Sequence, residues 1–174
     1  MVKIRNGFVS NSSSSSFVVA FPEMPTSAEH VKKMMFGDDE TFPNPYPISY
    51  SNRENEAEFP TMKIAETVYN DILEQKVNDK KNITEGFHGW LEGAPDIDYS
   101  YNKELTQEER NKEWDNYIKA DNKFRKDTAN TFIKERKDKF IYTFEYSDND
   151  GDYFCTMEHG GIFDNIDHIR VSRH

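Results

Sequence analysis

The run FVVAF at residues 17–21 constrains the fold most, because it is too apolar to be exposed and too short to form a core helix by itself. Serine precedes it and proline follows it, and its β-branched and aromatic residues favour an extended backbone. A continuous apolar run of this length is typical of a buried strand. The chain must therefore supply partner strands for it from elsewhere.

Both ends of the chain contain such partners. VKIRNGFV at residues 2–9 shows a weak alternation of apolar and polar residues. KFIYTFEYS at 139–147 alternates and is rich in aromatic and β-branched residues, and HIRVS at 168–172 is predicted as a final strand. Asp150-Gly151 predicts a hairpin turn that leads from residues 139–147 into YFCTME. We predict an α+β fold in which a small antiparallel sheet of N- and C-terminal segments packs against a helical middle region.

Two helices of moderate length are expected before the middle of the chain. Residues 27–36 follow a capping box formed by Thr26 and Glu29 and end at Gly37. Residues 61–76 repeat apolar side chains at helical spacing. These two segments supply the first part of the predicted helical layer.

The longest periodic element is predicted at residues 106–137. Thr106 and Glu109 form a second capping box, and the apolar stripe is incomplete and interrupted by charge. The favourable i,i+4 charge pairs are Glu108–Lys112, Asp115–Lys119 and Asp121–Arg125. We expect a long charged helix, or two helices with a break near Asp121.

Length and composition indicate one domain spanning residues 1–174. Hydrophobic residues make up only 35% of the chain while aromatic residues reach 14%, so much of the core must be aromatic. Residues 38–60 are acidic and contain four prolines, which predicts a Pro-rich acidic loop.

The formal net charge of −10 disfavours binding to a phosphate backbone and is compatible with protein partners. An alternative is an acidic mimic of nucleic acid that blocks a DNA-binding protein. Cys155 is the single cysteine, so no intramolecular disulfide framework is expected. No segment resembles a signal peptide or a membrane span, and we expect a cytoplasmic protein without a cofactor.

Five serines in a row, Ser12, Ser13, Ser14, Ser15 and Ser16, are a candidate binding segment. One hypothesis is a plain exposed connector between two paired strands. Others are a tag that a partner recognises, a modification site, or a polar turn that binds an anion. The run lacks the glycine and lysine of a P-loop, which argues against nucleotide binding.

The C-terminal segment contains the residues best suited to chemistry. Glu158 and His159 are the candidates for general acid/base work, although a turn with both side chains solvated is the preferred interpretation. Metal binding is the other alternative, and its ligands would be Cys155, His159, His168 and His174. Their spacing fits no standard zinc pattern, so we expect no metal.

The N-terminal KIRNGFVSNSSSSSF and the C-terminal SDNDGDYFCTMEHGGIFDNIDHIRVSRH resemble segments of uncharacterised bacteriophage and bacterial proteins. The resemblance covers residues 1–37 and 140–174 and implies no catalytic residue. It implies a phage or phage-derived accessory protein, directed at the host or carried in the virion. We expect a non-enzymatic role in protein–protein binding; the alternative is a small metal-dependent hydrolase built on the C-terminal His/Glu cluster.

Overall fold

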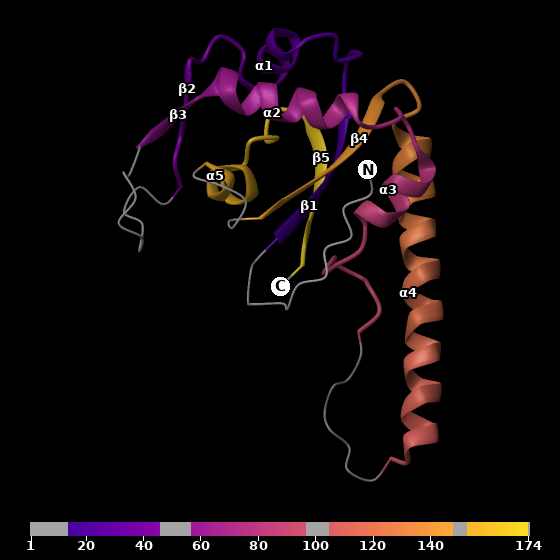
Figure 1. Cartoon of the computed structure of the whole chain (residues 1–174). Coiled ribbons are helices and arrows are strands. Elements are labelled where there is room, and N and C mark those ends of the chain that lie inside the picture. The colour runs from indigo at the N-terminus through magenta and orange to yellow at the C-terminus, as the bar shows by residue number, and fades with distance from the viewer. Residues whose placement is uncertain (1–13, 46–56, 97–104, 148–152, 174) are drawn as a thin grey trace.

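The computed structural model of the protein describes residues 14–45, 57–96, 105–147 and 153–173 (Figure 1). The predicted α+β fold is confirmed, since strands from both ends of the chain form a small antiparallel sheet against helices from the middle. The elements are β1 (Ser14–Phe21), α1 (Ala28–Phe36), β2 (Thr41–Pro43), β3 (Glu58–Pro60), α2 (Thr61–Leu73), α3 (Lys80–Gly86), α4 (Gln107–Glu135), β4 (Phe140–Ser147), α5 (Phe154–His159) and β5 (Asp167–Ser172).

The strand β1 lies in the centre of a three-stranded sheet of order β4-β1-β5. Its pairing with β4 is antiparallel and runs from Ser14 opposite Ser147 to Phe21 opposite Phe140. Residues 15–20 pair antiparallel with β5 on the other side. This central position accounts for the apolar run, because every residue from 17 to 21 is at most 2% exposed.

Helices cover both faces of the sheet. Phe17, Val19 and Phe21 point into one core, which α1, α2 and α5 complete. Val18 and Ala20 point into a second core, which α3 and α4 complete. Figure 1 shows the resulting layers, with α1 and α2 above the sheet and α4 along its side. Because adjacent side chains of a strand face opposite ways, only a strand buried on both sides is apolar at every position.

The outer edge of β4 is closed by two amide side chains from the segment after α2. Gln75 donates from Nε2 to the carbonyl of Thr143 at 2.7 Å and accepts from the Thr143 N–H at 3.1 Å. Asn78 donates its backbone N–H to the Ile141 carbonyl at 3.0 Å, and its Oδ1 accepts from the Ile141 N–H at 2.8 Å. These contacts replace a fourth strand along Ile141 and Thr143 and keep this part of the edge from pairing with another chain.

The predicted helices are present with small differences. The N-cap of α1 is Ser27, whose side chain accepts from the His30 N–H, so the predicted cap at Thr26 is wrong by one residue. The capping box of Thr106 and Glu109 is confirmed. The helix α4 runs without a break through Asp121, because that carboxylate pairs with a side chain one turn further along the same helix.

The segment predicted as a loop at residues 38–60 is not loop throughout. The strands β2 and β3 pair antiparallel, with Phe42 opposite Phe59, and residues 46–56 lie outside the described part of the chain. Phe59 is buried and Phe42 packs on the main core. Burial of these two rings explains the short ladder, while Pro43 and Pro60 occupy strand ends, where a missing N–H is tolerated.

The predicted hairpin after β4 is wrong in its second arm. Residues 153–158 are not a strand, since α5 begins at Phe154, while Gly151 lies outside the described residues. The segment is helical because Met157 enters the main core while Tyr153 and Phe154, four and three residues before it, pack against that core. Among the helices described, none is long and apolar enough to cross a membrane.

Candidate functional site

The serine run begins the central strand instead of joining two strands. Ser14, Ser15 and Ser16 lie in β1, and Ser15 and Ser16 are 0% and 1% exposed. The predicted exposed connector is therefore wrong for these three residues, whereas Ser12 and Ser13 lie outside the described part of the chain. Ser15 and Ser16 face opposite sides of the sheet, and each leaves space above it because its side chain is small. Longer side chains from neighbouring residues extend into this space.

Long side chains of the two flanking strands extend over the serines. Arg170 of β5 donates from Nε to the Ser15 hydroxyl at 3.1 Å. On the face that α4 covers, Arg173 and Glu145 come from opposite sides of β1 and form an ion pair at 2.9 Å above Ser16. A larger residue in place of either serine would occupy the space that these arginines use. The serines thus act as spacers beneath a polar surface.

Arg170 also connects the sheet to the end of α5. Its Nη2 donates to His159 Nδ1 at 3.2 Å, and His159 Nε2 lies 3.4 Å from the carboxylate of Glu158. A guanidinium can only donate, so Nδ1 accepts and Nε2 carries the ring proton. Both ring nitrogens therefore face protein groups, whereas a general base needs a ring nitrogen that faces a substrate.

The solvated turn predicted for these two residues is wrong. Glu158 and His159 are the last residues of α5, and the Glu158 side chain is fully buried. Arg170 was not predicted as a site residue, although strand alternation placed it on the same face as His168. That alternation was the only sequence signal for its position.

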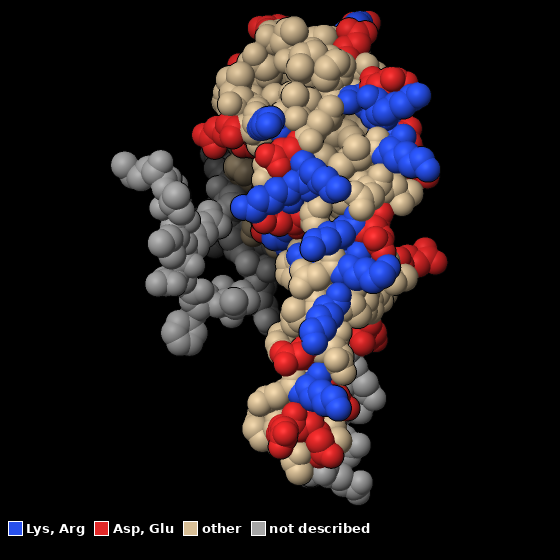
Figure 2. Space-filling model, turned by 90° about the vertical axis from the view of Figure 1, so that its right-hand side faces the viewer, with Lys and Arg blue, Asp and Glu red and all other residues tan. Residues whose placement is uncertain are grey.

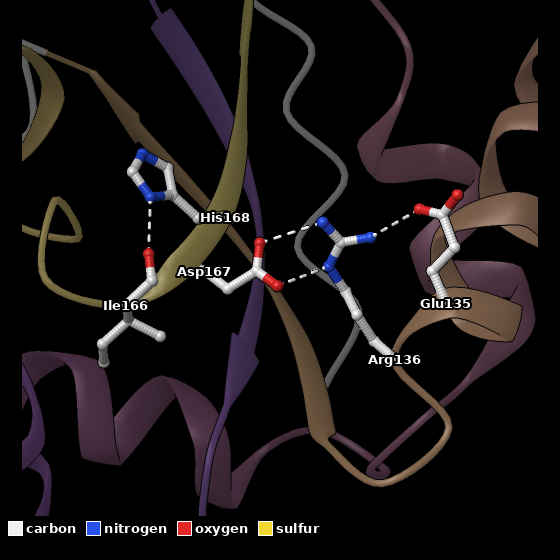
Figure 3. Close-up of polar contacts among 5 residues, drawn as sticks. All are labelled: Glu135, Arg136, Ile166, Asp167 and His168. Atoms are coloured by element: carbon white, nitrogen blue, oxygen red, sulfur yellow. Dashed lines mark hydrogen bonds and ion pairs between the residues drawn. The ribbon is translucent and has the colours of Figure 1, made fainter.

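The proposed metal ligands are held in different environments. The His168 Nδ1–H donates to the Ile166 carbonyl at 2.9 Å (Figure 3). The His168 ring packs near Phe17 and Phe163. Cys155 is half-buried in α5, and His174 lies outside the described residues. Within the described ranges, no group of three or more His, Cys, Asp and Glu side chains could hold a metal ion.

A polar pocket of about 390 Å³ lies on the other face of the sheet, between α3, α4 and the strands. Ser16 lines it, and its buried hydroxyl has no hydrogen-bond partner among the described residues. Glu85 and His88 line the same pocket, but no hydrogen bond joins them to Ser16 in the described structure. The residue types of a serine hydrolase are therefore near one another without the nucleophile–base contact that activates the hydroxyl.

The helix α4 is attached to the sheet near its C-terminal end. Ala129 and Phe132 are buried there. Arg136, which follows the helix, donates two hydrogen bonds to the Asp167 carboxylate at 2.8 and 3.0 Å (Figure 3). Its guanidinium lies over the Phe132 ring. The hydrogen bonds with Asp167 raise the pKa of Arg136 further above its ordinary value. This bidentate contact joins the end of α4 to the first residue of β5.

The outer face of α4 carries a row of exposed basic side chains. Figure 2, which views the molecule from the α4 side, shows Lys and Arg side chains along the length of the helix. The row consists of Lys112, Lys119, Lys123, Lys126 and Lys134, which are all exposed and spaced by three to eight residues. Of these, Lys123 forms an ion pair, with Asp127. The row is a local basic surface on a chain of net charge −10.

Comparisons of this chain with protein-family models, with curated protein sequences and with solved structures found no match. Function is therefore inferred from the surfaces and pockets described above.

Proposed function

We propose that this protein acts by binding another protein through the N-terminal half of α4. The observation that carries the proposal is that residues 107–120 contain no buried side chain although they form a continuous helix. Figure 1 shows this half of the helix projecting past the end of the sheet. A helical segment of this length is marginal in water without packing, so a projecting one is suited to supplying surface to a partner.

The chemistry of this surface favours a partner with an apolar recess. Trp114 is 49% exposed, and its ring lies 5.6 Å from the ring of Tyr117. Tryptophan and tyrosine are the residues that most often anchor protein interfaces. Lys112 and Lys119 are exposed on the opposite side of the helix, so the aromatic pair and not the basic row forms the proposed contact.

We further propose that the role is non-enzymatic and that the protein is a phage or phage-derived accessory protein. The resemblance of residues 1–37 and 140–174 to bacteriophage and bacterial proteins supports the second part. The occupied ring nitrogens of His159 and the missing nucleophile–base contact at Ser16 support the first. The cytoplasm of the producing cell is the proposed place of action, in keeping with a single cysteine.

The experiment is affinity capture from producing cells with three forms of the full chain, followed by mass spectrometry. The forms are the natural sequence, Trp114→Ala and the control Lys134→Ala, which changes an exposed residue at the other end of α4. We expect a partner that the natural chain and the control retain and that Trp114→Ala loses. A partner retained equally by all three forms would contradict the role of the projecting half.

A further inference from the structure

The outer edge of β5 has backbone groups that are available for pairing. The Arg173 N–H donates to the Ser14 carbonyl, so in this antiparallel ladder residues 167, 169, 171 and 173 direct their backbone groups towards β1. His168, Arg170 and Ser172 therefore direct theirs outward. The Ser172 carbonyl accepts from the Trp90 N–H at 2.7 Å, whereas no described residue pairs with the outward groups of His168 and Arg170.

The two edges of the sheet differ in this respect. Gln75 and Asn78 satisfy the outward groups of Thr143 and Ile141 in β4, so that part of the edge is protected. An unprotected edge strand is a template for another extended chain, and proteins that do not use such an edge usually cover it. At β5 the cover stops at Trp90, which leaves a length of strand that matches a short extended peptide.

An apolar groove of about 560 Å³ lies beside this edge, between β5 and α4. Phe124, Phe132 and Ile169 line it, with charged residues of α4 at its margin. The side chain of Ile169 points to the α4 face of the sheet, and Arg170, one residue on, points to the face on which it contacts His159. Figure 3 shows the same alternation at Asp167 and His168, whose side chains leave β5 in opposite directions.

We propose that an extended peptide segment of a partner protein, with alternating apolar and acidic residues, binds here as a fourth strand. Its backbone pairs with the outward groups of His168 and Arg170. The residue opposite Ile169 lies on the same face as Ile169, so an apolar side chain there enters the groove. The residue opposite Arg170 lies beside the guanidinium, which favours a carboxylate. The inference builds on the proposed function, since it names the segment that the α4-bound partner would contribute.

The test uses a fluorescent ten-residue peptide of alternating valine and glutamate, titrated with the full chain and followed by anisotropy. The control peptide has the same residues with N-methyl groups on alternate backbone nitrogens, which removes the pairing donors. A second control replaces glutamate by lysine. We expect the first peptide to bind saturably. Both control peptides should bind at least about tenfold more weakly than the first peptide.

Two proline variants test the direction of the backbone groups. In Arg170→Pro the missing N–H is an outward one, so the sheet should fold while peptide binding falls about tenfold. In the matched Ile169→Pro the missing N–H points to β1, so this variant should be strongly destabilised. Hydrogen exchange gives a measurement without substitution: the amides of His168 and Arg170 should exchange fast in the free protein and slow down when the peptide is bound.

The outcomes separate this inference from the proposed function. The fourth-strand proposal would be overturned if the plain and N-methylated peptides bound equally well. It would also be overturned if the peptide did not bind and the amides of His168 and Arg170 exchanged fast with and without it. Loss of a captured partner in Trp114→Ala would then still support the proposed function. A dimer of this chain that Arg170→Pro dissociates would show a second copy at the edge and would also overturn the proposed occupant.

Discussion

Gln75→Ala should lower the free energy of unfolding by about 2 kcal/mol, an effect expected of a core residue and not of a polar one. The Gln75 amide makes one hydrogen bond in each direction with the backbone of Thr143, at 2.7 and 3.1 Å, and its Nε2 also donates to the Asp71 carbonyl at 3.2 Å. A hydrogen bond contributes about 1 kcal/mol net, and an unsatisfied part-buried group costs about 1–3 kcal/mol. Partial hydration of the opened edge keeps the total at about 2 kcal/mol, the middle of this range.

The measurement is urea unfolding followed by circular dichroism, with Gln107→Ala as the matched control. Gln107 is exposed on α4 and bonds only to Asn111 one turn away, so its replacement should change the free energy of unfolding by about 0.5 kcal/mol or less. The opened edge of β4 should also make Gln75→Ala more prone to self-association, which sedimentation detects. If Gln75→Ala were as stable as Gln107→Ala and stayed monomeric, the edge-closing role of Gln75 would be refuted.

Three further changes test other parts of the structure. Phe132→Ala should destabilise the protein by about 3–5 kcal/mol, measured by the same unfolding assay, because this ring anchors α4 and is 2% exposed. Burial raises the pKa of Asp71, so the stability that this residue contributes is highest at low pH and is lost as the pH rises through its folded-state pKa. Asp71→Asn, which can still accept from the Tyr146 hydroxyl, should therefore gain stability relative to the natural chain as the pH rises through that window; a constant difference would contradict this. Gly86→Ala should lower the melting temperature, because its Cβ would lie 2.9 Å from Val18 Cγ2, and an unchanged value would show that the neighbouring strand yields easily.

The sheet was predictable from the sequence wherever side-chain polarity determined the structure. FVVAF is apolar at every position, residues 140–147 are mostly aromatic or β-branched, and residues 168–172 contain Ile169 and Val171, so burial and backbone preference agree. Ser14, Ser15 and Ser16 were not predictable as strand, because serine has no strong strand preference. They join β1 through the backbone ladder and through Arg170 and its neighbours, which lie more than 120 residues away.

The hairpin prediction after β4 gave a local turn signal more weight than the packing of the residues that follow it. The residues YFCTME are equally consistent with a helix of one and a half turns. The core formed with α2 and β3, into which this helix packs, could not be recognised from the sequence. The candidate site was predictable only in part for a similar reason. The residues Glu158 and His159 were identified, but their contacts with Arg170 and the burial of Glu158 depend on where α5 packs.

The strand order β4-β1-β5 has a consequence for folding during synthesis. The first described strand, at residues 14–21, pairs only with strands at 140–147 and 167–172, so its hydrogen bonds cannot form until the ribosome has made both. Contacts of such long sequence separation slow folding, because a large loop must close before they form. Meanwhile α1 and α2, which lie close together in the sequence, can pack on each other early. FVVAF therefore emerges well before both of its partner strands and waits for them longest, which makes it the segment on which a chaperone has most time to act.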